Sequence, residues 1–155
     1  MNGFLESDLF SALPPIPPPS LINWERLRHI AGVDPDFPRV LVQAFVDNGL
    51  EQLALLHQAL QDQDLSQLAV LAHGLRGSGG NVGSEAFEGL AQRLEGLVHP
   101  LVHPLVHPER TEPAPIALEG IPAIQEALIA QAGSLVDEME AMLHSIEQEL
   151  RSTDD

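Results

Sequence analysis

The sequence contains no cysteine and no lysine, and these two absences exclude several kinds of function before any motif is considered. Without cysteine the chain forms neither disulfides nor thiolate metal sites, and its redox compartment cannot be read from the sequence. Every basic residue is an arginine, seven in all against 23 acidic residues, which gives a net charge of −16. Nucleic acids and anionic membrane surfaces are bound through basic patches, so we expect neither as a partner.

Long apolar segments are also missing. No apolar run approaches the roughly 18 residues that a membrane-spanning helix needs. The first ten residues, MNGFLESDLF, carry acidic side chains where a secretory signal has basic ones. The 155 residues are enough for one domain with its own core and too few for two comfortable ones. These features predict a soluble, cytoplasmic protein built around one domain.

Proline divides the chain into segments. Residues 1–20 end in ALPPIPPPS, which blocks helix formation and predicts a flexible, proline-rich tail. Residues 97–120 contain the unit Leu-Val-His-Pro three times, and a proline at every fourth position predicts a low-complexity insertion outside any helix. The domain itself is expected over 21–151, with a short C-terminal tail at 152–155.

Apolar residues at spacings of three and four predict helices over the remaining segments. The first is expected at 23–32 with Asn23 as its cap, and the second at about 34–61, opened by Asp34 and Pro35. The third opens at Asp64, a fourth starts near Ser84, and the last covers 122–151. The inward stripe of the last helix is expected to comprise Ile124, Leu128, Ala132, Leu135, Met139, Met142, Ile146 and Leu150. No strand pattern is found, so the expected fold is all-α: an antiparallel four-helix bundle with a short additional N-terminal helix.

The glycine-rich stretch AHGLRGSGGNVG, residues 72–83, is unusual for a helix because glycine costs about 0.5–1 kcal/mol there relative to alanine. A phosphate-binding P-loop is excluded because it needs a lysine, and a dinucleotide-binding fingerprint would need glycine where Val82 stands. Gly79 and Gly80 are expected to let two helices approach closely. Gly83 is expected to supply the positive φ that ends the third helix.

His73 lies in this stretch, and the apolar pattern of the helix predicts that its side chain points outward. Arg76 at i+3 and Gly77 at i+4 then share its face, so the imidazole has a cation on one side and an open position on the other. This arrangement suits a nitrogen that carries a phosphoryl group, because neutral imidazole is nucleophilic and arginine can pair with phosphoryl oxygens. The alternative interpretation is structural: a polar surface residue in a helix that the glycines end.

The letters of this stretch resemble the signature of histidine-containing phosphotransfer (HPt) domains, which runs roughly Ala-His-x-Leu-Lys-Gly-Ser-x-x-x-x-Gly. The resemblance covers residues 22–95 and, more loosely, 121–151. It implies that His73 is the phospho-accepting residue, that Arg76 replaces the usual lysine, and that Gly77 admits the partner. Glu95 falls where the family often has a polar residue near the imidazole; it is either an orienting group or a solvated glutamate.

The resemblance implies a phosphorelay intermediate that shuttles a phosphoryl group on His73 between aspartate-phosphorylated receiver domains in a two-component pathway. Its partners would be response-regulator receiver domains, a hybrid sensor histidine kinase, or both. The chain would be a carrier without kinase activity of its own and without a bound cofactor, and the Mg²⁺ that transfer requires would belong to the receiver partner. The alternative is a helical docking module that binds a receiver or kinase without accepting phosphate.

The other histidines carry weaker signals. His99, His103 and His107 lie in the Leu-Val-His-Pro repeat, where a flexible loop is favoured over a metal site because the proline after each histidine restrains the chain toward extended forms. A metal-sensing role for the repeat is a third hypothesis. His29, His57 and His144 show no constellation and are interpreted as partly exposed helix residues.

Overall fold

The computed structural model describes residues 20–102 and 122–152. These residues form helices and no strands, which confirms the all-α fold. The helices are α2 (Trp24–Ala31), α3 (Phe37–Gln61), α4 (Leu65–Asn81), α5 (Glu85–Val102) and α6 (Pro122–Ser152). No helix in this part of the chain is long and apolar enough to cross a membrane.

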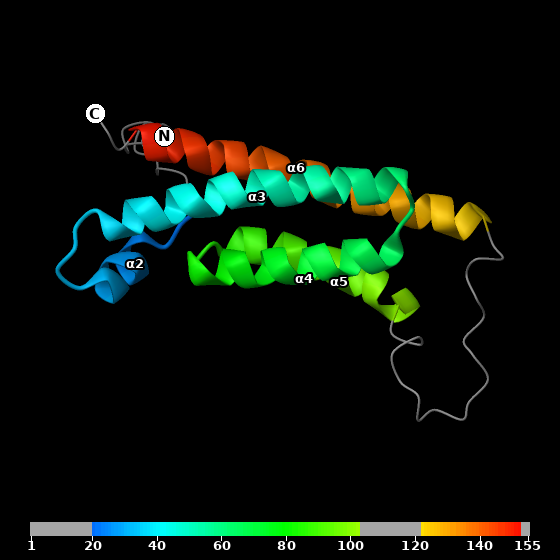
Figure 1. The fold of residues 1–155 in the computed structure, drawn as a ribbon, viewed down its shortest axis with the longest axis horizontal. Helices are drawn as coiled ribbons and strands as arrows, with labels where there is room; N and C mark the ends of the chain where they lie inside the picture. The colour runs from blue at the N-terminus through cyan, green and yellow to red at the C-terminus, as the bar shows by residue number, and fades with distance from the viewer. Residues whose placement is uncertain (1–19, 103–121, 153–155) are drawn as a thin grey trace, which may run out of the picture.

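The four long helices run alternately up and down and form two layers (Figure 1). One layer pairs α3 with α6, and the other pairs α4 with α5. The short helix α2 packs against the start of α3 and lies at the end of the bundle where α4 turns into α5. The predicted antiparallel bundle with an additional N-terminal helix is therefore confirmed. The turn between α4 and α5 lies next to α2.

Two of the predicted helix caps are present. The Asn23 side chain accepts a hydrogen bond from the backbone N–H of Arg26 at 3.0 Å, and Asp64 accepts one from that of Gln67 at the same distance. Each bond satisfies one of the backbone donors that the first turn of a helix leaves unpaired. The sequence therefore specifies where α2 and α4 begin.

The start of α3 differs from the prediction. The helix begins at Phe37 and places Pro38 in its first turn, where a missing N–H costs nothing. The Asp34 side chain, predicted to cap the helix, accepts instead from the backbone N–H of Asp36 at 3.0 Å, which closes a local turn ahead of it. Both Asp-Pro and Asp-Phe-Pro offer a plausible start, and the structure uses the second.

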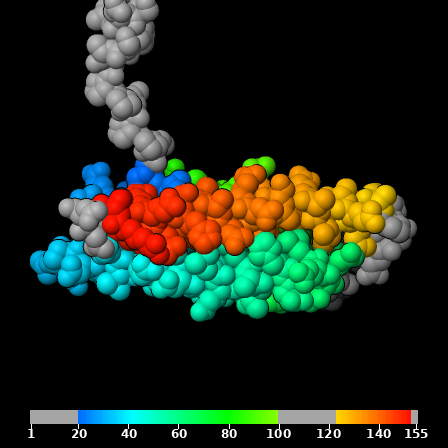
Figure 2. Space-filling view, turned by 90° about the horizontal axis from the view of Figure 1, so that it is seen from above, coloured from blue at the N-terminus to red at the C-terminus, as the bar shows by residue number. Residues whose placement is uncertain are grey.

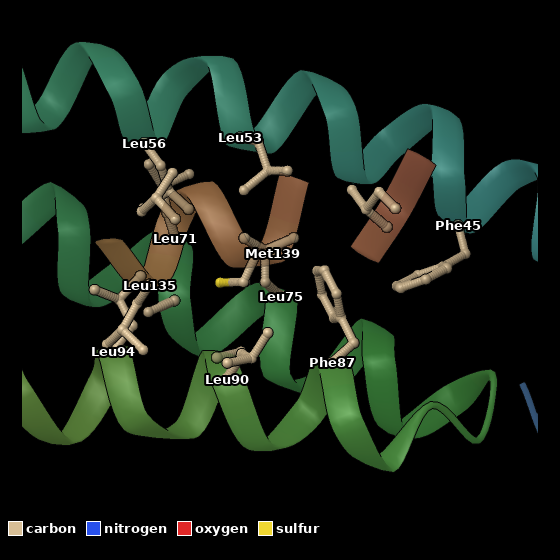
Figure 3. Packing of buried hydrophobic residues seen from close by; sticks show 14 of the residues in the cluster. Phe45, Leu53, Leu56, Leu71, Leu75, Phe87, Leu90, Leu94, Leu135 and Met139 are labelled. Atoms are coloured by element: carbon tan, nitrogen blue, oxygen red, sulfur yellow. The ribbon is translucent and has the colours of Figure 1, made fainter. Parts of the chain in front are cut away.

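The core fills the space between the two layers with aliphatic and aromatic side chains (Figure 3). Phe45 from α3 and Phe87 from α5 meet edge to face, with ring centroids 5.1 Å apart and an interplanar angle of 86°. This geometry is the favoured one for aromatic pairs. The largest fully buried side chains belong to Phe87, Leu27, Leu53, Leu56, Leu68, Leu75, Leu94, Met139, Leu143, Ile146, Leu150 and Val42.

The inward stripe predicted for α6 is correct over most of the helix and differs from the structure at the start of the helix and near Met142. Ile124 is exposed, and Leu128 and Met142 are only partly buried, whereas Leu143, which the prediction omitted, is fully buried. The first turns of α6 extend beyond the end of α3 in Figure 1, so an apolar residue there has no helix to pack against. Helical periodicity does not say how far the neighbouring helix reaches.

The boundary of the predicted insertion, residue 97, was also wrong. Helix α5 continues to Val102 and includes Pro100. Val98 is fully buried and extends the apolar stripe of the helix by one turn, so tertiary packing carries α5 into the proline-containing segment. Residues 103–120 of the predicted insertion, and residues 1–19 of the predicted tail at 1–20, lie outside the described residues.

Candidate functional site

Helix α4 presents His73 to solvent because the opposite face of the helix is committed to the core. Leu68, Ala72, Leu75 and Gly79 are buried, and they place His73 on the outer face with its side chain 75% exposed. Arg76 and Gly77 follow on that face one turn later, as the sequence predicts.

The glycines of α4 serve two purposes. A Cβ atom on Gly77 would have no heavy atom within 4 Å beyond its own helix, so the surface beside His73 is open. A Cβ on Gly79 would lie 3.1 Å from the backbone nitrogen of Glu88 and 3.0 Å from the ring of Phe87, so this glycine lets α4 and α5 approach closely. A Cβ on Gly80 would make only ordinary van der Waals contact, 3.6 Å from the Glu88 carboxylate. Gly80 is therefore not required for the close approach of α4 and α5 that was predicted for both glycines.

Gly83 lies where the α4–α5 turn packs against the N-terminal end of α2. Its φ of +69° is the left-handed value predicted for it, and a Cβ there would lie 2.7 Å from the Cβ of Asn23. The glycine therefore meets two requirements at once: the turn that ends α4, and the close packing of the α2 cap against that turn.

Glu95 on α5 joins the histidine and the arginine. One of its carboxylate oxygens lies 2.9 Å from His73 Nδ1, and the other accepts a hydrogen bond from Arg76 Nη1 at 3.1 Å. The Glu95 side chain is only 16% exposed, so its position is set by the packing of α5 against α4. The sequence offered two interpretations of Glu95, and the structure places it in direct contact with the imidazole.

These contacts determine the protonation of the pair. The hydrogen bond from His73, supported by Arg76, holds the pKa of the Glu95 carboxyl below its ordinary value, against the opposing effect of burial. The carboxylate is therefore ionised at neutral pH and acts only as an acceptor, so Nδ1 of the imidazole carries the proton. In the neutral ring the lone pair then belongs to Nε2, the nitrogen not engaged by Glu95.

An open groove of about 420 Å³ adjoins the imidazole. It contains a second arginine, Arg26 of α2, whose Nη1 donates to the backbone oxygen of Gly80 at 3.3 Å. Sequence reasoning missed Arg26, because α2 is far from α4 along the chain and only the packing of α2 at the end of the bundle brings it here. The groove is lined by Arg26, His73, Arg76, Gly77, Gly80, Asn81 and Glu88.

The remaining described histidines lie elsewhere. His144 on α6 lies 3.7 Å from Glu147, and His99 is exposed near the end of α5. His57 on α3 was expected to have no constellation, and this was wrong: its Nε2 lies 3.1 Å from a Glu140 carboxylate oxygen on α6. The sequence could not show this pairing, because it depends on how α3 packs against α6. His103 and His107 lie outside the described residues.

Comparison with known proteins agrees with this architecture. The family model of the Hpt domain matches residues 40–149, most of the chain, and the protein belongs to this family. Its role is accordingly histidine phosphotransfer in phosphorelay signalling. The comparison with curated proteins finds no matching sequence.

A solved structure shows the same fold. The chain is similar to the crystal structure of histidine-containing phosphotransfer protein B from Pseudomonas aeruginosa PAO1, with 23% sequence identity and a TM-score of 0.51. The match covers 83% of this chain and 90% of that chain. At this level of identity the likeness concerns the helical bundle alone.

Proposed function

We propose that the protein carries a phosphoryl group on Nε2 of His73 and passes it between receiver domains that hold phospho-aspartate. The observation that carries this proposal is the hydrogen bond between His73 Nδ1 and the ionised Glu95. The His73 side chain is three-quarters exposed and lies beside an open groove. The bond directs the nucleophilic lone pair to Nε2 and holds the ring in one orientation.

The transfer step follows from this arrangement. The lone pair on Nε2 attacks the phosphorus of the partner's phospho-aspartate, the new N–P bond forms, and the aspartate oxygen leaves with the electrons of the breaking P–O bond. The ring keeps its proton on Nδ1 and becomes cationic as the bond forms. Glu95, 2.9 Å away, stabilises that developing charge more strongly than it stabilises the neutral ring. Return transfer to a second receiver reverses the step.

Arg76 and Gly77 prepare the surface for the phosphoryl group and the partner. Glu95 holds Arg76 beside the imidazole through one nitrogen. A guanidinium carries five N–H donors, so Arg76 can pair with phosphoryl oxygens while it keeps this bond. Gly77 leaves the space in which the partner's active site approaches the ring. Exposed Val70, one turn before His73, supplies an apolar contact for docking on the same face.

The partner completes the reaction. In this proposal a receiver domain, alone or within a hybrid sensor kinase, supplies the aspartate and the Mg²⁺, and this chain supplies a nucleophile in a fixed position without kinase activity of its own. Arg26 and Arg76 line the groove together with the carboxylate of Glu88, and Arg76 is also paired with Glu95. In a chain whose net charge is −16, these two arginines favour the approach of a phosphorylated, acidic active site. A cytoplasmic location stays a prediction from composition.

The test is label transfer from a receiver domain phosphorylated at aspartate, in Mg²⁺, to wild type and to His73→Gln. We expect acid-labile label on the wild type and none on the variant, with unchanged helicity. His144→Gln is the matched control, since it removes another exposed histidine with a glutamate neighbour. Label on His73→Gln would overturn the assignment, and binding of the receiver without transfer to wild type would favour a docking module.

A further inference from the structure

A second group of polar side chains lies in the layer opposite His73, between α3 and α6. His57, Asp137 and Glu140 each offer one donor atom, and these three atoms lie within 4.8 Å of one another. One pair, His57 Nε2 and a Glu140 oxygen, is 3.1 Å apart. None of the three takes part in the site around His73.

The packing of two helices creates this group. Asp137 and Glu140 are three residues apart and therefore lie on one face of α6. Their neighbours Val136 and Met139 are buried, and α6 lies beside α3 over most of its length (Figure 2). The contact between Glu140 and His57 shows that this face of α6 meets α3 at His57. The backbones of both helices are fixed by the core, and only side-chain rotations are needed to adjust the three donor atoms.

We propose that His57, Asp137 and Glu140 bind a zinc ion that bridges α3 and α6. The donor set is one imidazole nitrogen and two carboxylate oxygens, which are ligands of Zn²⁺, whereas Mg²⁺ and Ca²⁺ favour oxygen donors alone. Two carboxylates and a neutral imidazole balance the charge of a divalent cation, within a protein whose net charge of −16 attracts cations.

The geometry requires a small contraction. Zn–N and Zn–O bonds of about 2.1 Å in a tetrahedral arrangement place ligand atoms roughly 3.4 Å apart. The His57 and Glu140 donor atoms are already 3.1 Å apart. No two of the three donor atoms are more than 4.8 Å apart, so the widest pair has to approach by at most about 1.4 Å to reach the spacing in a tetrahedral site. The metal replaces the hydrogen between Nε2 and Glu140, and the imidazole proton moves to Nδ1. With His57 and Glu140 side chains 39% and 43% exposed, water completes the fourth position.

The primary test is calorimetric titration of the full chain with Zn²⁺, without any receiver present. We expect wild type to bind one Zn²⁺ per chain, with saturation at micromolar Zn²⁺. The affinity of His57→Gln should be at least about tenfold lower, because the loss of even a residue that only supports a ligand weakens metal binding by about 10–100-fold. Glu140→Gln, which keeps the volume and a hydrogen-bonding group beside His57, should show the same loss. His144→Gln is the matched control and should bind as wild type does.

A second variant separates this site from the histidine repeat. The triple substitution His99→Gln, His103→Gln and His107→Gln should leave one-to-one binding intact, because the repeat is not part of the proposed site. Absence of binding by wild type, or loss of binding in the triple variant with retention in His57→Gln, would overturn the proposal. Since zinc would bind the folded bundle only, it should also raise the unfolding temperature of wild type and not that of His57→Gln.

The zinc site is independent of phosphotransfer. Its failure would leave the role of His73 untouched, and a loss of label transfer in His73→Gln would say nothing about zinc. In zinc-free buffer, His57→Gln should accept the phosphoryl group at the wild-type rate, because His57 lies in the other layer of the bundle.

Discussion

Replacing Glu95 by glutamine tests the central physical argument, that a carboxylate steers the nucleophile. Glutamine keeps the size of the side chain and one acceptor oxygen but removes the negative charge. A hydrogen bond to a charged group contributes about 1.5–3 kcal/mol and a neutral one about 0.5–1.5 kcal/mol. Because the His73 side chain is 75% exposed, we take the low end of the difference, about 1 kcal/mol.

This magnitude sets the expected rate. The interaction strengthens as the ring becomes cationic, so its loss falls on the transition state, and about 1 kcal/mol corresponds to roughly fivefold slower transfer. The assay is single-turnover transfer from a saturating phosphorylated receiver, combined with ¹⁵N NMR of the imidazole. We expect the fraction of His73 protonated at Nδ1 to fall in the same variant, which a purely structural role of Glu95 would not produce.

Glu88→Gln is the matched control for Glu95→Gln. Glu88 is another carboxylate on α5 that lines the groove, but it lies against Gly80 at the end of α4 and makes no contact with the imidazole that the structure records. It should change neither the tautomer nor the single-turnover rate. Wild-type transfer by Glu95→Gln, or an equal loss in Glu88→Gln, would refute the steering argument.

Three further outcomes are expected. The folded-state pKa of Glu95 lies below the ordinary 4.5, so the stability that its carboxylate gives the fold is complete above pH 4.5 and disappears as the pH falls through the lower, folded value. In urea unfolding, the difference in unfolding free energy between wild type and Glu95→Gln should therefore shrink below pH 4.5. Gly77→Ala should leave the fold intact or stabilise it by up to about 1 kcal/mol. Gly79→Ala should destabilise the fold by about 1–3 kcal/mol, because the added Cβ meets the α5 backbone. Equal changes in unfolding free energy for the two variants, measured in denaturant titrations, would contradict this expectation. Arg26→Ala should slow receiver association by up to about fivefold at low salt, and Arg28→Ala, on the same helix outside the groove, should not; an equal effect of both would point to net charge alone.

Local patterns anticipated the part of the site that lies on one helix. The apolar spacing of α4 places His73, Arg76 and Gly77 together because residues three and four apart share a helical face in any bundle. The α4 cap at Asp64 and the positive φ of Gly83 are equally local, since each depends on a few neighbouring residues.

The contacts that tune the imidazole needed the packed bundle. The sequence left Glu95 with two interpretations, and only the approach of α5 to α4 puts its carboxylate 2.9 Å from Nδ1. The sequence offered no signal for Arg26, whose contribution depends on where α2 packs. His57 was interpreted as solitary for the same reason: its neighbours on α6 are distant in sequence.

By itself the sequence determined the existence of the helices, most of their inward faces, the all-α bundle and the outward face that His73 shares with Arg76 and Gly77. It did so because helical periodicity and capping act over three or four residues. The tertiary structure alone decided which carboxylate meets His73, that Arg26 joins the groove, that His57 lies beside Glu140 and that α5 continues through Pro100. These depend on the offset and rotation of one helix against another, which are set by the fit of many buried side chains together.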